Sequence, residues 1–139
     1  IFVWSTNCPP CQTFFRQKLW PLVQDAQNGA DLQVSLVQHE TSPENREQIA
    51  ELICKGVDRY HWTAIRHLLT GREFRSLAKE QPPKSLNPGT IAKVCDNKAD
   101  VRFYLAALAK EGTRKLNGRA VPVLIVNGQA VDDLEKWTP

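Results

Sequence analysis

The chain has 139 residues, of which 42% are hydrophobic and 24% charged, and its formal net charge is +3. This length suits one globular domain that buries a core without disulfide staples. Lysines and arginines are scattered along the chain instead of clustered, so nucleic-acid binding is not indicated. No apolar stretch approaches the roughly 20 residues of a membrane span and no secretory leader opens the chain, so we expect a soluble domain.

The first predicted elements are a short strand and a helix, with two cysteines at their junction. Residues 1–4 form an apolar run typical of a strand, and residues 11–29 carry apolar side chains at helical spacing. The sequence Cys8-Pro9-Pro10-Cys11 lies between them. A helix start offers unpaired backbone N–H groups and the positive end of the helix dipole, and both favour a thiolate over a thiol. We therefore predict that Cys8 is the reactive thiol of a redox pair, because such sites lower a cysteine pKa from about 8.5 to roughly 3.5–7.5.

The helix after the motif contains a proline and is followed by a second strand. Pro21 lacks an N–H group and collides with the carbonyl four residues earlier, so we expect the helix to bend near Trp20. Residues 32–37 alternate apolar and polar side chains, which predicts a strand. The order strand, helix, strand places the two strands parallel, with the helix on one face of the sheet.

The middle of the chain, from Thr41 to about Asn117, is predicted to be helical throughout. Ser42-Pro43-Glu44 is a strong helix start, and Gly56 is expected to end that helix. The other expected helices cover residues 58–69, 73–80, 87–95 and 100–115, with a loop at residues 81–83. The sequence thus predicts a helical layer inserted between strands.

The last predicted elements are two strands joined by a tight turn. Residues 121–126 are strongly apolar, Asn127-Gly128 is a strong hairpin signal, and residues 129–131 form the return strand. Only X-Pro bonds adopt the cis form at modest cost. A cis Val121-Pro122 bond would leave the Val121 backbone free to pair with a substrate, whereas the alternative is an ordinary proline at the start of a strand. Since the chain starts within a strand and stops soon after this hairpin, we expect both ends to be trimmed.

These motifs, taken together, resemble the thioredoxin superfamily and, within it, the DsbA-like branch. The similarity lies in Cys-Pro-Pro-Cys after an apolar strand, the long helical insertion, and Val-Pro before an apolar strand that ends in Asn-Gly. Residues 49–56 and 92–96 also resemble helices of the inserted part. The resemblance implies an α/β, thioredoxin-like fold with a central mixed sheet. Its thioredoxin-like domain would comprise residues 1–40 and 117–139, and its inserted helical subdomain, with the return helix, residues 41–116.

The same resemblance implies a thiol-disulfide oxidoreductase that acts on protein substrates. Cys8 would be the exposed nucleophile, and Cys11 the buried partner that resolves a mixed disulfide. No cofactor is expected beyond the disulfide between them. The implied partners are unfolded or thiol-containing proteins and a membrane redox protein that reoxidises or reduces the pair. The implied location is the bacterial periplasm or another extracytoplasmic space.

The substrate-binding residues are also implied by the resemblance. Val121 and Pro122 would form a cis-proline element that faces the disulfide and pairs with an extended peptide. Pro9 and Pro10 would flank the reacting sulfur. Trp4, just before the motif, is expected to line the substrate groove, with a core position as the alternative.

Two departures from the DsbA pattern leave the direction of electron flow open among oxidase, reductase and isomerase. Pro10 stands where DsbA has a histidine that helps to hold the thiolate, and proline has no N–H to donate. This predicts a reduction potential more reducing than that of a Cys-Pro-His-Cys oxidase, although the valine before Pro122 is common in oxidases. Phe2 stands where many relatives have an acid, so Cys11 would have to lose its proton through water or through a group from elsewhere.

The remaining cysteines allow several interpretations. Cys54 and Cys95 would pair in an oxidising compartment, and the alternative is two free thiols in the core. Zinc is disfavoured because this second pair has a long spacing, and His39, His61 and His67 do not form a ligand set, so no metal site is expected. A rival function uses the same active-site pair: a thioredoxin-like metallochaperone would bind Cu(I) through Cys8 and Cys11.

Overall fold

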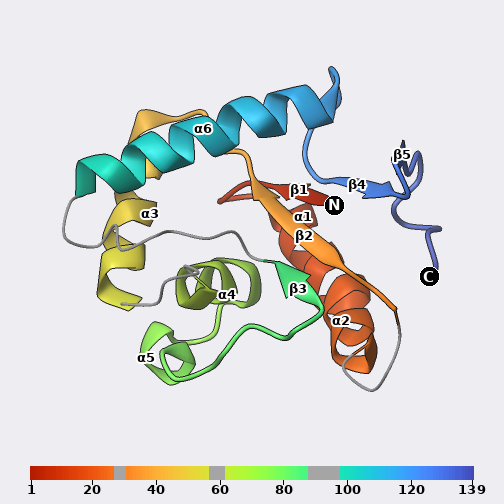
Figure 1. The fold of residues 1–139 in the computed structure, drawn as a ribbon, viewed down its shortest axis with the longest axis horizontal. Coiled ribbons are helices and arrows are strands. Elements are labelled where there is room, and N and C mark those ends of the chain that lie inside the picture. The colour runs from red at the N-terminus through yellow and green to blue at the C-terminus, as the bar shows by residue number, and fades with distance from the viewer. Residues whose placement is uncertain (27–30, 57–61, 88–97) are drawn as a thin grey trace.

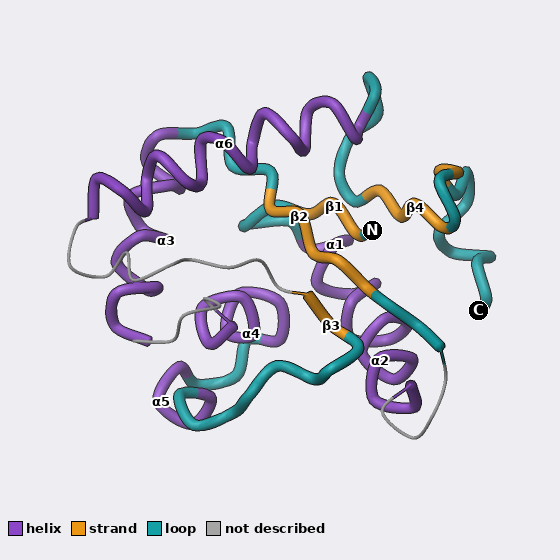
Figure 2. Tube along the Cα trace, viewed as in Figure 1, coloured by secondary structure: helices purple, strands orange, loops and turns teal. Residues whose placement is uncertain are grey.

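The computed structural model describes residues 1–26, 31–56, 62–87 and 98–139. These residues form an α/β structure in which a five-stranded mixed sheet lies between helices (Figures 1 and 2). The strands are β1 (Phe2–Trp4), β2 (Val34–Gln38), β3 (Leu86–Asn87), β4 (Val123–Val126) and β5 (Gln129–Ala130). The helices are α1 (Pro9–Phe14), η1 (Phe15–Leu19), α2 (Trp20–Ala26), α3 (Pro43–Gly56), α4 (Trp62–Thr70), α5 (Phe74–Leu77) and α6 (Lys98–Leu116).

The strands follow the order β3-β2-β1-β4-β5 across the sheet. Strand β1 pairs in parallel with β2 and antiparallel with β4, and β4 and β5 form the predicted hairpin. At the turn, Asn127 and Gly128 both have positive φ, which is the conformation that favours Asn-Gly in tight hairpins. The described architecture is compatible with a thioredoxin-like fold.

The prediction that residues 41–117 are helical throughout is wrong at β3. Leu86 and Asn87 pair in parallel with Val34 and Ser35 at the edge of the sheet. Two residues are too few to produce an alternating pattern, and the strand forms because the open edge of β2 supplies backbone partners. The helix expected to begin at Asn87 therefore does not start there, and its remaining residues 88–95 lie outside the described residues.

The helix that follows the motif changes geometry before Pro21. Its first turns are α-helical, residues Phe15–Leu19 form a π-helical turn, and α-helical geometry resumes at Trp20. The Trp20 N–H donates to the Phe15 carbonyl, five residues back. The expected bend near Trp20 is thus a local widening of the helix, at the place where Pro21 removes a donor and crowds the preceding turn.

Both faces of β1 are covered, and successive side chains enter different clusters. Phe2 and Trp4 lie in the main core with residues of α1, η1, α2 and α4, while Val3 packs with Leu116 of α6 on the other face (Figure 1). Helix α6 approaches the sheet closely: a Cβ at Gly112 would lie 2.9 Å from the His39 ring. A second core, formed by α3, α4 and α6, contains Ile49, Ala50, Ile53, Ala64, Val101 and Leu105.

None of the helices within the described ranges is long and apolar enough to cross a membrane.

Candidate redox active site

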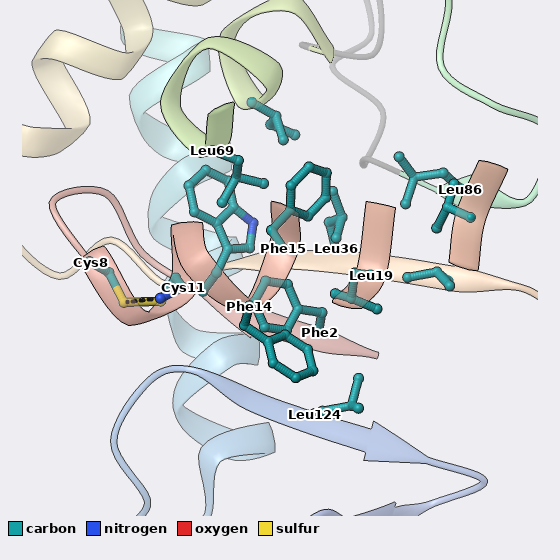
Figure 3. Close-up of a cluster of buried hydrophobic side chains, with 14 of the residues drawn as sticks. Phe2, Cys8, Cys11, Phe14, Phe15, Leu19, Leu36, Leu69, Leu86 and Leu124 are labelled. Carbon is teal, nitrogen blue, oxygen red and sulfur yellow. Dashed lines mark hydrogen bonds between the residues drawn. A yellow bond between two sulfur atoms is a disulfide. The ribbon is translucent and has the colours of Figure 1, made fainter. Parts of the chain in front are cut away.

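The cysteine motif forms the start of α1. Cys8 is the N-cap residue, and Pro9 and Pro10 occupy the first helical positions. These positions suit proline because their N–H groups would have no acceptor within the helix. The first available donor is the Cys11 N–H, which lies 3.2 Å from the Cys8 sulfur and donates to it (Figure 3). The motif therefore has the local geometry predicted from its sequence.

Cys8 and Cys11 are joined by a disulfide, with their Cα atoms 5.2 Å apart. The bond lies at the edge of the main hydrophobic cluster (Figure 3). Cys8 is 7% exposed and Cys11 is 0% exposed. Both cysteines are therefore buried, and the expectation that Cys8 is exposed is wrong for this disulfide form, because Cys8 packs into the main hydrophobic cluster. Cys11 is buried, as expected, and of the two cysteines Cys8 keeps the larger exposed fraction.

Pro122, far from the motif in sequence, lies next to it in space. The Val121-Pro122 peptide bond is cis, in agreement with the first of the two interpretations of this proline. Pro122 lines a hollow of about 720 Å³ together with Pro9, Pro10, Thr13, Phe14, Gln17, Lys18, Leu134 and Glu135, which we call the redox hollow. Val121, which is partly buried, is not among the lining residues. The structure thus brings together the two prolines of the motif and the predicted cis-proline.

Trp4 does not line the substrate groove; that expectation is wrong. Its side chain is 1% exposed and belongs to the main core. The reason is the position of β1, which has β2 on one side and β4 on the other and helices on both faces. A short central strand of this kind leaves none of its side chains at the surface.

Glu40 is a site residue that sequence reasoning missed. Its side chain is 1% exposed, and its carboxylate accepts the backbone N–H of Thr6, in the loop between β1 and Cys8. A buried carboxylate is costly unless such bonds satisfy it. Gln38, in register with Trp4, is also buried. In the structure, burial alternates through residues 34, 36, 38 and 40, but the sequence carries no such signal because Gln38 and Glu40 are polar.

Phe2 occupies the position at which the resemblance implies an acid. It is fully buried and stacks on Phe14 of α1, with the ring centroids 5.4 Å apart. The ring pair joins β1 to the helix that carries the disulfide. At this point of the core the structure has an apolar contact that fixes the helix against the sheet.

Cys54, His39 and His67 do not line the redox hollow, and His61 lies outside the described residues. Cys54 is a free, partly buried thiol beside the second core. Its expected partner, Cys95, lies outside the described residues, so the bridge between them stays a prediction. His39 Nε2 lies 3.0 Å from the Thr113 hydroxyl, and His67 Nδ1 donates to the Arg72 carbonyl. Within the described ranges, no group of three or more His, Cys, Asp or Glu side chains could hold a metal ion.

No family model matches the chain, and neither a curated protein nor a solved structure matches it significantly. The functional argument therefore depends on the chemistry of the site itself.

Proposed function

We propose that this protein is a thiol-disulfide oxidoreductase that exchanges disulfides with protein substrates through Cys8 and Cys11. One observation carries the proposal: the disulfide lies at the start of α1, where Cys8 keeps 7% of its surface exposed and Cys11 keeps none. That difference favours attack at Cys8 and keeps Cys11 inside the protein.

In the oxidising direction, a substrate thiolate attacks the Cys8 sulfur. The bond between the two sulfurs breaks, its electron pair leaves on Cys11, and a mixed disulfide joins the substrate to Cys8. A second substrate thiolate then attacks the substrate sulfur of the mixed disulfide and releases Cys8. Two electrons pass from the substrate to the cysteine pair, and in the reducing direction the same steps run backwards.

The stabilisation of the Cys8 thiolate determines which direction is favoured. The Cys11 N–H donates to the Cys8 sulfur, whereas Pro9 and Pro10 have no N–H to add. A thiolate with few donors makes the dithiol less stable and the disulfide less oxidising, by about 30 mV for each 1.4 kcal/mol. We therefore propose a potential more reducing than that of a Cys-Pro-His-Cys oxidase.

The redox hollow is the proposed binding surface for substrate. Its walls include the apolar side chains of Pro9, Pro10, Phe14, Pro122 and Leu134, and its two motif prolines lie between Cys8 and Cys11 in the chain. A hollow of about 720 Å³ has room for side chains of an extended peptide. The preferred substrate would thus present an apolar side chain close to its reacting cysteine.

The same proposal also assigns a fold family, a cellular compartment and a redox partner to the protein. The α/β sheet with an antiparallel hairpin after the helical region supports a thioredoxin-like fold with a DsbA-like insertion. An oxidoreductase of this kind would work in a bacterial extracytoplasmic space, where protein disulfides persist. A membrane redox protein would then restore the state of the cysteine pair.

The deciding experiment combines an exchange assay with a redox titration. Purified protein is incubated with a reduced, unfolded substrate and, separately, with a disulfide-containing one, and thiols are counted over time. Cys11→Ser should trap a mixed disulfide on Cys8, whereas Cys8→Ser should not. Titration against glutathione then gives the potential. Stoichiometric Cu(I) binding without exchange in either direction would contradict the proposal and support the metallochaperone alternative.

A further inference from the structure

A second hollow lies on another part of the molecule and is lined mainly by polar side chains. It has a volume of about 370 Å³ and lies between α2, α4 and the segment after α5. We call it the arginine pocket, and its principal lining residues are Trp20, Gln24, Arg66, Arg72, Glu80 and Gln81. Its volume is within the range of small-molecule sites, at the lower end.

Arg66 is the most unusual residue of this pocket because its charge is almost fully buried. The residue is 5% exposed, and its guanidinium carbon lies 3.7 Å from the ring centroid of Trp20 and 5.6 Å from that of Trp62. A cation on aromatic faces is partly compensated for the loss of water. Stacking leaves the in-plane N–H groups of the guanidinium available to acceptors.

The positive charge in the pocket exceeds the negative charge. One Glu80 oxygen lies 3.5 Å from Arg66 Nε, and the other lies 2.9 Å from Arg72 Nη1. Two cations thus share one carboxylate. Arg66 Nε is buried without a hydrogen bond, because the 3.5 Å contact is too long for a strong one. Burial lowers the pKa of Arg66, and Glu80 only partly opposes this effect.

We propose that the arginine pocket binds a small molecule through an oxyanion group, a phosphate or a carboxylate, held by Arg66 and Arg72. Both groups fit the planar fork of a guanidinium, which prefers two parallel hydrogen bonds to oxygens. Gln24 and Gln81 supply further polar atoms at the wall. Glu80 occupies the place between the arginines and is displaced by the incoming anion. This inference is independent of the proposed redox function.

The test uses inorganic phosphate as the probe, in titrations of the full chain at constant ionic strength. Binding is followed by NMR through the Arg66 Nε–H and Trp20 indole N–H signals, with acetate in a parallel titration to separate phosphate from carboxylate recognition. We expect saturable shifts of both signals in the unchanged protein. Arg72→Ala should weaken binding at least about tenfold, since a hydrogen bond to a charged group is lost. Arg75→Ala, at an exposed arginine of α5 outside the pocket, should leave affinity unchanged.

The Glu80→Gln variant tests whether the arginine pocket is a binding site or only a structural ion-pair network. The variant removes the resident carboxylate charge, so phosphate should bind about tenfold more tightly and raise the melting temperature more than in the unchanged protein. Circular dichroism checks that each variant is folded. Equal affinity in Glu80→Gln and the unchanged protein would overturn the proposal. Equal effects of Arg72→Ala and Arg75→Ala, or the absence of saturable shifts for both anions, would also overturn it.

Discussion

The redox hollow and the arginine pocket have opposite wall chemistry. The redox hollow is lined by three prolines, a phenylalanine and a leucine, together with Thr13 and Gln17, and its charged members, Lys18 and Glu135, carry one charge of each sign. In the arginine pocket, Arg66 and Arg72 share the single carboxylate of Glu80, and the Arg66 guanidinium stacks on Trp20. The first suits an apolar peptide segment, and the second suits an anion.

The continuous helical segment formed by α1, η1 and α2 contributes to both sites. Pro9, Pro10 and Phe14 of α1 line the redox hollow, whereas Trp20 and Gln24 of α2 line the arginine pocket. The π turn over Phe15–Leu19 lies between these two sets. Because wider helical turns change which side chains share a face, the interruption before Pro21 separates the residues that line the two pockets. Variants that change one pocket and leave the other intact test whether the two surfaces act separately.

The largest effect is expected at the disulfide. Cys8→Ser should abolish thiol exchange with a protein substrate, because it removes the sulfur of the more exposed cysteine, which we propose is the one attacked. Cys54→Ser, at the free thiol beside the second core, is the matched control and should retain exchange. Thiol counting during the reaction measures both. Exchange by Cys8→Ser at the unchanged rate would refute the assignment.

The second-largest effect is expected on the stability of the protein, through the loop between β1 and Cys8. Glu40→Ala should lower the free energy of unfolding by about 1 kcal/mol, since the partly buried N–H of Thr6 loses its acceptor. Glu40→Gln keeps an acceptor oxygen and should lose less. Asp31→Ala, at an exposed acid, is the control. Urea unfolding compares the three variants, and equal losses in all of them would exclude a role for the Glu40 contact.

A third change tests whether the two sites recognise different chemistry. Leu134→Ser should reduce kcat/KM with a protein substrate about tenfold, because burial of an apolar side chain against substrate contributes roughly 1.5 kcal/mol or more. The reduction potential should stay the same. Gln81→Ser in the arginine pocket is the control and should not change this rate. Equal losses in the two variants would mean that the sites do not differ as proposed.

The smallest expected effect is on the potential itself. Pro10→His adds a backbone N–H and an imidazole beside Cys8, which stabilises the thiolate and makes the pair more oxidising by about 30 mV or more. Pro10→Ala restores the N–H alone and should produce a smaller shift in the same direction. A glutathione titration measures both. A shift toward a more reducing potential would contradict the role assigned to Pro10.

The features that could be predicted from the sequence depend on residues that are neighbours in the chain. The cysteine motif lies at a helix start because prolines suit the first helical positions, and Asn127-Gly128 forms a hairpin because both residues tolerate positive φ. The helix that starts at Pro43 was predicted from Ser42, Pro43 and Glu44 and ends at Gly56, as expected. In each of these cases the residues that carry the signal are neighbours in the chain.

Other features depend on segments that are distant in sequence. Strand β3 exists because the edge of β2 pairs with it, and Trp4 is buried because β1 became a central strand. The residues around β3 and those around Trp4 do not indicate which strands will lie beside them. Glu40 is a third case, since neither its burial nor its contact with Thr6 follows from the polar residues around it.

From the amino-acid order alone, the cysteine pair was expected at a helix start and a hairpin near the end of the chain, because each depends on backbone preferences within a few residues. The fold was needed to show that Cys8 is buried with Cys11, that Val121 does not line the redox hollow beside Pro122, and that Arg66 is buried against Trp20. These outcomes depend on how surfaces from different elements pack together, and packing is a property of the whole fold.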